Sequence, residues 1–486
     1  MLPHYLWAQS DAETNPLRIP PLLTGERSGN RQRYQLDVRS GASEFFPGFS
    51  TPTYGINGDF LGPTLRLRRD DEVTISVNNQ LDEATTLHWH GLHVPAAADG
   101  GPHQVIEPGS SWNANFHVNQ EAGTFWYHSH LLGLTGEQVY KGLAGMLQIE
   151  DDNSSSLELP SEYGVDDVPL IIQDRNFNAD GSFRYMNTPM ESMLGAFGNT
   201  VMVNGTISPR FEPATQKVRF RLLNGSNART YNLAFSDGRE MQQLACDGGF
   251  LEAPVTMRQI ELAPGERCEV VADFSDGQPV DLISLPMAAD SPFRTTGMMG
   301  NMHTMNQVRL QVLAIRPQGN RQSSAALPSV LSSLPAIDSD SADRMRQFTL
   351  SMPMGMGMMG RGRGGRGGMG RGMGSMLTIN GAPMDMETIN ERVPVGSTEI
   401  WEIYNDSMMM HPFHIHHGQF RIVSSNNRAW PAHEQAYKDT VKVGPGQRVR
   451  VLMKFEDYAD PELPYMYHCH ILEHEDAGMM GQFVVE

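Results

Sequence analysis

The chain has 486 residues, and its 56 Asp and Glu outnumber its 37 Lys and Arg, so that the formal net charge is −19. This balance disfavours binding to nucleic acids and to anionic membranes and favours attraction of cations. The length exceeds what one compact core holds and indicates about three domains. No run of eighteen apolar residues occurs, so no transmembrane helix is predicted.

Two short patterns recur once in each third of the chain. The first is an alternating strand, which reads EVTISVNN, KVRFRLLN and EIWEIYND. The second is a turn with Pro-Gly followed by an alternating strand, which reads EPGSSWNANFHV, APGERCEVVADF and GPGQRVRVLMKF. Pro-Gly turns between apolar runs of period two are typical of all-β proteins. Three copies therefore predict an all-β chain of three consecutive Greek-key β-sandwich domains.

Composition predicts where these domains end. We expect domain 1 at residues 1–150, before the acidic, Ser-rich segment DDNSSSLELPSE, and domain 2 at residues 165–315. A linker rich in Ser, Pro and Ala follows at 316–344. Domain 3 then covers 345–486 and carries an insert at 351–376 that is rich in Met, Gly and Arg.

Four pairs of the form His-x-His lie outside domain 2. Residues i and i+2 of a β-strand point to the same face, about 6 to 7 Å apart. This spacing suits two neighbouring metal ions, which paired sites hold about 3.5 to 4 Å apart. Structural zinc takes four closed ligands, often with several cysteines, and does not need so many histidines. We therefore predict a metal cluster that is formed by the pairs His88 and His90, His128 and His130, His414 and His416, and His468 and His470.

The copies of the repeat differ in these histidines. The first strand pattern leads to HWHG in domain 1 and to HPFHIHH in domain 3, but to RTYNLAF in domain 2. Domain 2 is therefore predicted to be structural. The cluster should lie between domains 1 and 3, where bound metal would hold the two ends of the chain together.

The C-terminal segment YHCHILEHEDAGMM supplies a second set of soft ligands, Cys469, His474 and Met479. In the strand HCH the thiolate lies on the face opposite to the two imidazoles. A turn after the strand can return His474 and Met479 to the side of the thiolate. Together with His411, which the pairs do not use, they form a set of two histidines, a thiolate and a weak axial methionine. This set is typical of a blue-copper electron-transfer site.

These motifs resemble those of the multicopper oxidases, in particular the bacterial cuprous oxidases and laccase-like enzymes of the CueO type. The resemblance covers nearly the whole chain, because YGINGDFLGPTLRLR, HWHGLHVP, WYHSH, HPFHIHHGQF and HCHILEHEDAGMM follow one another in the order of that family. It implies cupredoxin-like domains and four copper ions, namely one type 1, one type 2 and a type 3 pair, with dioxygen as the electron acceptor. The implied ligands are His411, Cys469, His474 and Met479 for type 1, His88 and His414 for type 2, and His90, His128, His470 and His130, His416, His468 for the two type 3 ions.

Proton delivery and electron transfer involve three further expectations. Reduction of dioxygen to water consumes protons, which need carboxylates within reach. Asp99 in AAADGGP and Glu475 match positions that the family uses for proton delivery, and the alternative for each is a solvated loop acid. Cys469 is the covalent neighbour of His468 and His470, which gives electrons a short through-bond route.

The insert SMPMGMGMMGRGRGGRGGMGRGMGSM, residues 351–376, bears on the electron donor. Its glycine content excludes a helix or strand and predicts a mobile loop. Thioethers select Cu(I), and a second methionine-rich stretch, MMGNMHTM, adds to the supply. We expect a substrate Cu(I) ion at Asp406 and Met409, with help from Met352 or Met354, and additional copper ions at the methionine-rich segments.

This donor site follows the cuprous oxidases incompletely. Their insert lies at the same place, but they carry an acid where this chain has Ser407, and their insert has an acid and histidines where this one has arginines. A laccase with phenols or aromatic amines as donors is therefore the alternative, with the loop as a lid. A copper-sequestering protein without turnover is the alternative from another class. Binding of nucleic acid to the Gly-Arg tract is disfavoured, because the tract lacks aromatics and the protein is acidic.

Three further expectations concern where the protein is located, how it assembles and what its other two cysteines do. The segment MLPHYLWAQSDAE shows no basic region followed by an apolar stretch, so no intact signal peptide is visible. Since the resembled family is usually exported, we expect a periplasmic or exported monomer whose signal has been removed. Cys246 and Cys268 form a disulfide or are buried thiols, and both alternatives stay open.

Overall fold

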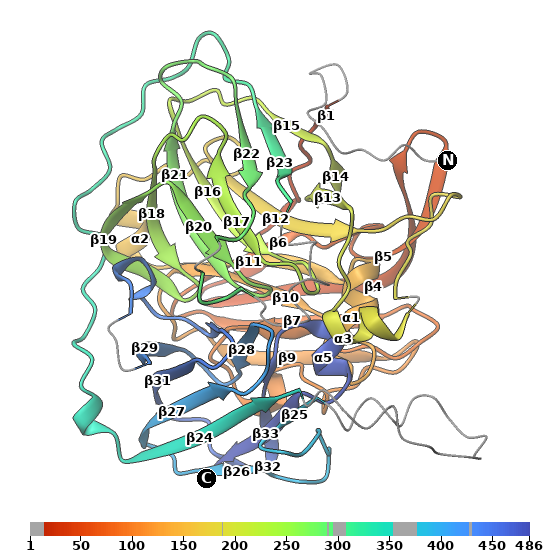
Figure 1. The fold of residues 1–486 in the computed structure, drawn as a ribbon, viewed down its shortest axis with the longest axis vertical. Helices are drawn as coiled ribbons and strands as arrows, with labels where there is room; N and C mark the ends of the chain where they lie inside the picture. The colour runs from red at the N-terminus through yellow and green to blue at the C-terminus, as the bar shows by residue number, and fades with distance from the viewer. Residues whose placement is uncertain (1–13, 187, 289–290, 295–307, 353–376, 427–429) are drawn as a thin grey trace.

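The computed structural model describes residues 14–486 except 187, 289–290, 295–307, 353–376 and 427–429. These described residues form paired β-sheets in three consecutive domains, which confirms the predicted all-β fold of three sandwich domains. In Figure 1 the green strands of domain 2 lie above the blue strands of domain 3, with the orange strands of domain 1 beside both. No helix among the described residues is long and apolar enough to span a membrane.

Domain 1 packs two sheets against each other. Its strands are β2 (Leu22–Leu23), β3 (Glu26–Ser28), β4 (Arg31–Phe46), β5 (Phe49–Ile56), β6 (Thr64–Arg68), β7 (Glu72–Asn79), β8 (His88–His90), β9 (Ser111–His117), β10 (Gly123–His128) and β11 (Ala144–Glu150). One sheet has the order β2-β6-β11-β10-β8 and the other β3-β4-β7-β9, with β5 on β4. Strict alternation along β7 buries Val73, Ile75 and Val77 between them.

Domain 2 repeats this plan with longer sheets. Its strands are β12 (Asp167–Arg175), β13 (Thr200–Val203), β14 (Thr206–Ile207), β15 (Pro209–Phe211), β16 (Lys217–Asn224), β17 (Tyr231–Phe235), β18 (Met241–Cys246), β19 (Gly249–Met257), β20 (Gln259–Leu262), β21 (Arg267–Asp273), β22 (Val280–Ser284) and β23 (Leu310–Ile315). The sheets have the orders β14-β13-β12-β16-β21-β18-β19 and β1-β15-β23-β22-β17-β20. Strand β1 (Asn15–Pro16) precedes domain 1 in sequence but pairs in parallel with β15, so these two residues belong to a sheet of domain 2.

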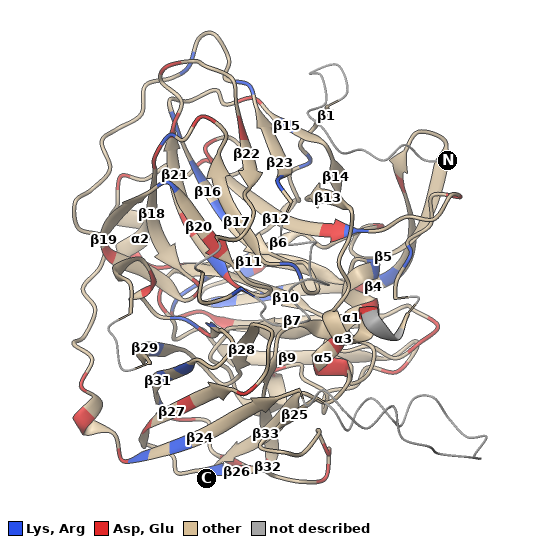
Figure 2. Ribbon diagram, in the orientation of Figure 1, with Lys and Arg blue, Asp and Glu red and all other residues tan. Residues whose placement is uncertain are grey.

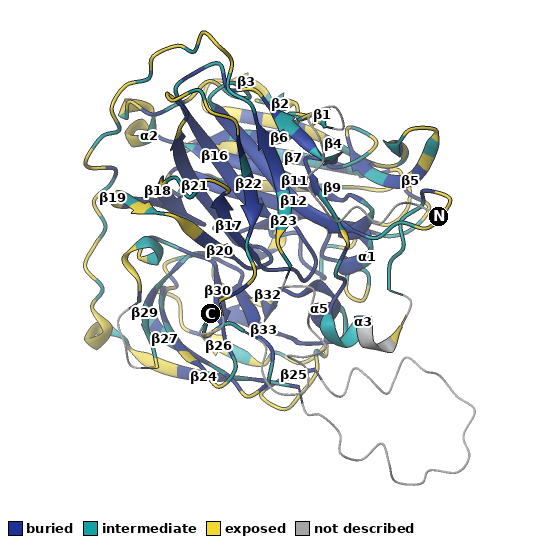
Figure 3. Ribbon diagram, turned by 45° about the horizontal axis from the view of Figure 1, so that its top comes forward, coloured by how far each residue is buried: buried dark blue, intermediate teal, exposed yellow. Residues whose placement is uncertain are grey.

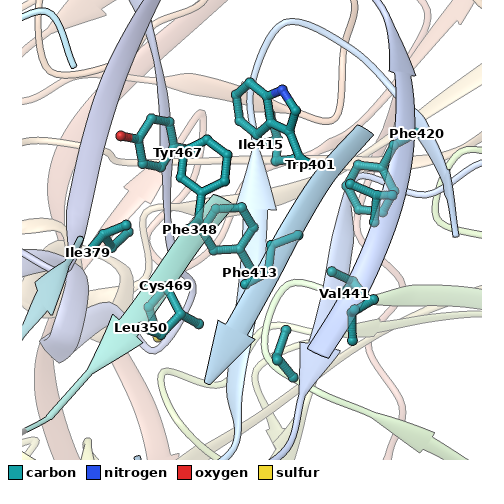
Figure 4. Close-up of a cluster of buried hydrophobic side chains, with 14 of the residues drawn as sticks. Phe348, Leu350, Ile379, Trp401, Phe413, Ile415, Phe420, Val441, Tyr467 and Cys469 are labelled. Atoms are coloured by element: carbon teal, nitrogen blue, oxygen red, sulfur yellow. The ribbon is translucent and has the colours of Figure 1, made fainter. Parts of the chain in front are cut away.

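Domain 3 carries both predicted metal-ligand motifs of the C-terminal part. Its strands are β24 (Arg344–Ser351), β25 (Thr378–Ile379), β26 (Glu391–Val393), β27 (Thr398–Asn405), β28 (His411–Ile415), β29 (Phe420–Ser425), β30 (Thr440–Val443), β31 (Arg448–Lys454), β32 (Asp460–Cys469) and β33 (Met480–Val485). The sheet β25-β24-β27-β31-β29 faces the sheet β26-β33-β32-β28-β30. The aromatic core between them includes Phe348, Trp401, Phe413 and Tyr467, and Cys469 lies at its edge (Figure 4).

Short helices gather where the three domains meet. They are α1 (Thr135–Lys141) of domain 1, α3 (Pro189–Leu194) of domain 2 and α5 (Leu472–Asp476) of domain 3, which lie side by side in Figure 1. Elsewhere lie α2 (Asp152–Ser156) and the 3₁₀ turns η2 (Ala96–Ala98), η4 (Ser339–Ser341) and η6 (Ala432–Glu434). The backbone N–H groups of Thr135 and Gly136 at the start of α1 donate to Asp476 of α5. These two hydrogen bonds join domain 1 to the turn that carries His474.

Buried ion pairs hold domain 2 on domain 3. Lys438 Nζ lies 2.9 Å from Asp247 Oδ2, and Lys442 Nζ lies 2.9 Å from Glu266 Oε2. In Figure 2 blue segments mark Lys and Arg on strands of domain 2, and Figure 3 shows that these strands are largely buried. A buried charge needs a partner of opposite charge. Because each of these pairs joins a lysine of domain 3 to an acid of domain 2, the pairs define how the two domains dock.

Candidate metal centre

The eight histidines of the four His-x-His pairs converge between domains 1 and 3. Strand pairing begins this convergence, because His128 lies opposite His88 in one sheet and His414 lies opposite His468 in the other. All eight imidazoles are buried, with exposures of 2% or less. We call this group the histidine cluster.

Within the histidine cluster, three groups of ring nitrogens each lie within 4.8 Å of one another. Every group draws ligands from both domain 1 and domain 3. The groups are His88, His90 and His414; His90, His128 and His470; and His130, His416 and His468. The second and third groups have the membership that the resemblance implies for the type 3 ions, and the first contains the implied type 2 pair.

The ring nitrogens face one another closely. His468 Nε2 lies 3.2 Å from both His130 Nε2 and His416 Nε2, and His128 Nε2 lies 3.4 Å from His90 Nδ1. Nε2 of His88 and of His414 is buried without a hydrogen-bond partner among the described residues. Buried polar atoms are ordinarily paired, so inward nitrogens without partners fit a centre that binds metal ions.

Oxygen acceptors hold most of these rings by Nδ1 and leave Nε2 directed inward. The hydrogen bonds join His88 to Asp99 O at 2.9 Å, His128 to Ser129 O at 2.8 Å, His414 to Asp439 O at 2.8 Å, His416 to Asp99 Oδ2 at 2.7 Å and His468 to Cys469 O at 3.1 Å. His90 is turned the other way, because its Nε2 lies 3.0 Å from Asp439 Oδ1. Such contacts orient a ring and define its tautomer.

Burial also sets the protonation of the cluster. Together with the charges of neighbouring histidines, it lowers the pKa of His416 to about 4 and that of His470 to about 3. These imidazoles are therefore neutral at physiological pH, which is the form that binds a metal.

The two predicted proton-delivery acids touch the histidine cluster from two sides. Asp99 Oδ2 contacts His416 as described, and the oxygens of Glu475 lie 3.3 Å from His130 Nδ1 and 3.2 Å from His468 Nδ1. Burial raises the pKa of each acid, but the adjacent histidines outweigh it and hold both pKa values well below the usual range. Their exposures of 2% and 1% exclude the alternative of solvated loop acids.

The second set of soft ligands forms a separate group, which we call the cysteine site. Cys469 Sγ lies 3.3 Å from His411 Nδ1 and 3.7 Å from His474 Nδ1, and these two nitrogens are 3.3 Å apart. Met479 is buried in the same apolar core, and its carbonyl accepts a hydrogen bond from the N–H of Cys469. Burial raises the pKa of the Cys469 thiol, whereas a coordinated metal ion would favour the thiolate.

Both imidazoles of the cysteine site are covered on their outer edges. His411 Nε2 lies 2.8 Å from Ser407 Oγ, and His474 Nε2 donates to the carbonyl of Met193 in α3 at 2.9 Å. Sequence reasoning missed both contacts. A backbone carbonyl leaves no trace in the sequence, and Met193 belongs to domain 2, which carries none of the predicted ligands.

The residues expected to hold a substrate Cu(I) ion are only partly brought together. Met352 and Met409 are buried in the same core of domain 3. Asp406 is exposed. Residues 353–376 of the insert, which include Met354, and the stretch MMGNMHTM lie outside the described residues. Cys246 and Cys268 are free, buried cysteines, so of the two alternatives they are thiols and not a disulfide.

Comparisons with known proteins agree with this geometry. Three models described as multicopper oxidase match residues 37–154, 164–281 and 363–486. The chain is 37% identical to the multicopper oxidase mco of Staphylococcus haemolyticus, with 97% of this chain and 92% of that protein covered. It is also 36% identical to the cell division protein FtsP of Dickeya dadantii, with 99% and 94% covered.

Solved structures give the same picture. The laccase-like multicopper oxidase CueO of Ochrobactrum sp., with oxidase activity towards lignin model compounds, superposes with a TM-score of 0.86 at 37% identity, covering 97% of this chain and all of that chain. A metallo-oxidase from Campylobacter jejuni has a TM-score of 0.84 at 30% identity, covering 99% and 98%. The chain therefore belongs to the multicopper oxidase family and is an oxidoreductase with copper cofactors.

Proposed function

We propose that this protein couples one-electron oxidation of Cu(I) to four-electron reduction of dioxygen to water, with four copper ions held by the cysteine site and the histidine cluster. The observation that best supports this proposal is that the tripeptide His468-Cys469-His470 contributes residues to both the cysteine site and the histidine cluster. Copper bound there would supply the one-electron and multi-electron redox chemistry. The proposed ligands are those that the resemblance implies, and the three histidine groups and the cysteine group support them.

Cys469 connects the two groups through its own backbone. Its side chain faces His411 and His474, while the residues before and after it face the histidine cluster. Electrons that enter at the cysteine site therefore have a covalent route of a few bonds to the cluster. The alternation of strand β32, which ends at Cys469, places the side chains of His468 and Cys469 on opposite faces.

Asp99 and Glu475 are proposed to deliver the protons that dioxygen reduction consumes. Each carboxylate is buried against Nδ1 atoms of two cluster histidines. Because their pKa values lie below the usual range, both carboxylates are charged in the resting protein.

The surroundings of the cysteine site support a metal ion as the donor. Both imidazole edges are buried and occupied, one by Ser407 and one by the Met193 carbonyl, so a flat phenol finds no bare histidine edge there. Met352 and Met409 supply thioethers in the adjoining core, and thioethers select Cu(I). We propose that the methionine-rich insert delivers Cu(I) to this side of domain 3.

Oxygen uptake with Cu(I) and with a phenol, with and without added Cu(II), tests this donor assignment. One variant lacks residues 353–376. A second variant keeps the length of this segment but has leucine in place of each of its methionines, so that it lacks only the thioethers. Loss of Cu(I) oxidation in both, with faster phenol oxidation in the deletion alone, supports the proposal. Unchanged Cu(I) oxidation in both variants would reject it and favour the laccase alternative, with phenols or aromatic amines as donors.

A non-catalytic role is the second candidate. The likeness to a cell division protein over 99% of the chain favours it, and a copper-sequestering protein belongs to the same class. Copper-loaded protein that binds the metal but takes up no oxygen with either donor would establish this candidate and exclude the first.

We further propose that the protein is a periplasmic or exported monomer. Its acidity suits attraction of cationic copper outside the cytoplasm. Cell fractionation and sedimentation of the purified protein test location and assembly separately.

A further inference from the structure

His90 is oriented differently from the other anchored rings of the histidine cluster. Its Nε2 lies 3.0 Å from Asp439 Oδ1 and 3.1 Å from Thr440 Oγ1, while its Nδ1 faces His128 Nε2 at 3.4 Å. A carboxylate only accepts hydrogen bonds, so Nε2 carries the proton and the lone pair is on Nδ1. The contact with Asp439 therefore determines which nitrogen His90 offers to a metal ion.

Asp439 is itself held by an arginine of domain 2. Both Asp439 and Arg267 are fully buried, and the guanidinium donates to Asp439 Oδ1 at 2.7 Å and to Oδ2 at 2.6 Å. The guanidinium also donates to the carbonyl oxygens of Thr124, Asp247 and Gly265 at 2.9 to 3.1 Å. Because these acceptors hold the planar guanidinium of Arg267 in place, its two hydrogen bonds define the plane of the Asp439 carboxylate. The single ammonium group of a lysine could not do this.

Two glycines permit this close approach. A Cβ on Gly91, which follows His90, would lie 2.2 Å from Asp439 Oδ2, and Gly91 has a φ of +85°. A Cβ on Gly265, which has a φ of +83°, would lie 3.0 Å from the ring of His470. Gly265 belongs to the Pro-Gly turn of the domain 2 repeat, so this turn packs directly against the histidine cluster.

We propose that domain 2 positions His90 for copper through the chain Arg267, Asp439 and His90, although domain 2 supplies no ligand of its own. Arg267 and Asp439 are thus positioning residues. The inference rests on the proposed copper centre and adds to it a dependence on the middle domain. Without Arg267, Asp439 would lose both guanidinium donors and turn toward other donors, and the ring of His90 would lose its defined orientation.

The test compares Arg267→Gln and Asp439→Asn with wild type. The control is Arg221→Lys, which alters another buried arginine of domain 2. Its guanidinium pairs with Asp167 and Glu269, donates to Thr124 Oγ1 and contacts no cluster histidine among the described residues. Copper affinity of each group is measured by chelator competition, following the thiolate absorption for the cysteine site and the remaining bound copper, by elemental analysis, for the histidine cluster. Ring ¹⁵N shifts of the copper-free proteins report the tautomer of His90.

We expect the copper affinity of the histidine cluster to fall about 10- to 100-fold in both variants, the range typical for loss of a contact behind a metal ligand. The ¹⁵N signal of His90 should lose its pure Nε2–H character, while the thiolate absorption and the control remain as in wild type. Asp439→Asn keeps the size of the side chain and serves if Arg267→Gln does not fold.

Unchanged cluster affinity together with an unchanged His90 signal in a folded variant would overturn the proposal. If the proposed copper centre itself were wrong, the result would differ, because even the wild-type protein would bind no copper in the histidine cluster. The ¹⁵N comparison would still decide whether Arg267 orients His90.

Discussion

Domain 2 and the two outer domains share one repeat but relate to the metal centre in different ways. In domains 1 and 3 the strand pattern leads to HWH and HPFHIHH, whereas the equivalent strand of domain 2, β17, begins with Tyr231 and carries no histidine. The fold alone therefore does not make a ligand. A metal site of this kind also requires histidines near the ends of the strands and a second domain that supplies the remaining histidines of each group.

Domain 2 nevertheless contacts both groups from behind. The Met193 carbonyl accepts from His474 at the cysteine site, and Gly265 packs on His470 in the histidine cluster. Asn227 donates to Glu473, which lies on the same helix as Glu475. The difference between the domains is thus one between supplying ligands and holding them in place.

The largest effect is expected for Cys469→Ser. A hydroxyl cannot replace a thiolate in the cysteine site, so the red-region absorption should vanish and oxidation of any donor should slow at least about a thousandfold, equal to about 4 kcal/mol of activation free energy. Cys246→Ser is the control from domain 2, because its Sγ donates to the His433 carbonyl and a hydroxyl can do the same. Substantial turnover in the Cys469 variant would contradict the assignment.

Glu475→Gln should separate the two half-reactions. Loss of the carboxylate beside His130 and His468 is expected to slow reoxidation by dioxygen by about 100-fold while reduction of the cysteine site stays fast. Stopped-flow absorption measures both steps. Glu473→Gln is the matched control on α5, because Glu473 faces Asn227 of domain 2. Equal slowing of both half-reactions would argue against proton delivery by Glu475.

Removal of copper should loosen the contact between domains 1 and 3. Each group of the histidine cluster draws ligands from both, so tight binding stabilises their docking, and its loss should lower the unfolding temperature by roughly 10 °C. Differential scanning calorimetry gives the shift, and hydrogen exchange locates it. The core strands of domain 2 should stay protected, whereas a melt that copper leaves unchanged contradicts the interface site.

The smallest effect concerns pH in the copper-free protein. Burial lowers the pKa of His416 and of His474 to about 4, below the value of 6.5 in an unfolded chain. The unfolded state therefore binds more protons between about pH 6.5 and pH 4, and stability should fall as the pH falls through this window. Each group contributes at most about 1.4 kcal/mol per pH unit. Denaturant titrations that show equal stability at pH 7 and pH 4 would refute this.

The sequence predicted the fold and the composition of both groups because alternation is a local property. On a strand, the histidines of His-x-His share one face. His88 and His90 lie wholly within β8, whereas the second histidine of each other pair lies one or two residues beyond the end of its strand. The all-β fold followed from the turn and strand repeats for the same reason.

The contacts that domain 2 makes could not be predicted in this way. Arg267 meets Asp439 across 172 positions of sequence, and their meeting depends on how two whole domains dock. The Met193 carbonyl could belong to any residue, and the pairing of β1 with β15 depends on where the N-terminal segment runs. Long-range packing of this kind has no periodicity that a single sequence displays.

The most direct test of the account is the copper content of fully loaded protein, measured together with its visible absorption spectrum. The account predicts four copper ions per chain and strong absorption in the red region from the Cys469 thiolate. One copper ion per chain, or loaded protein without that absorption, would contradict it.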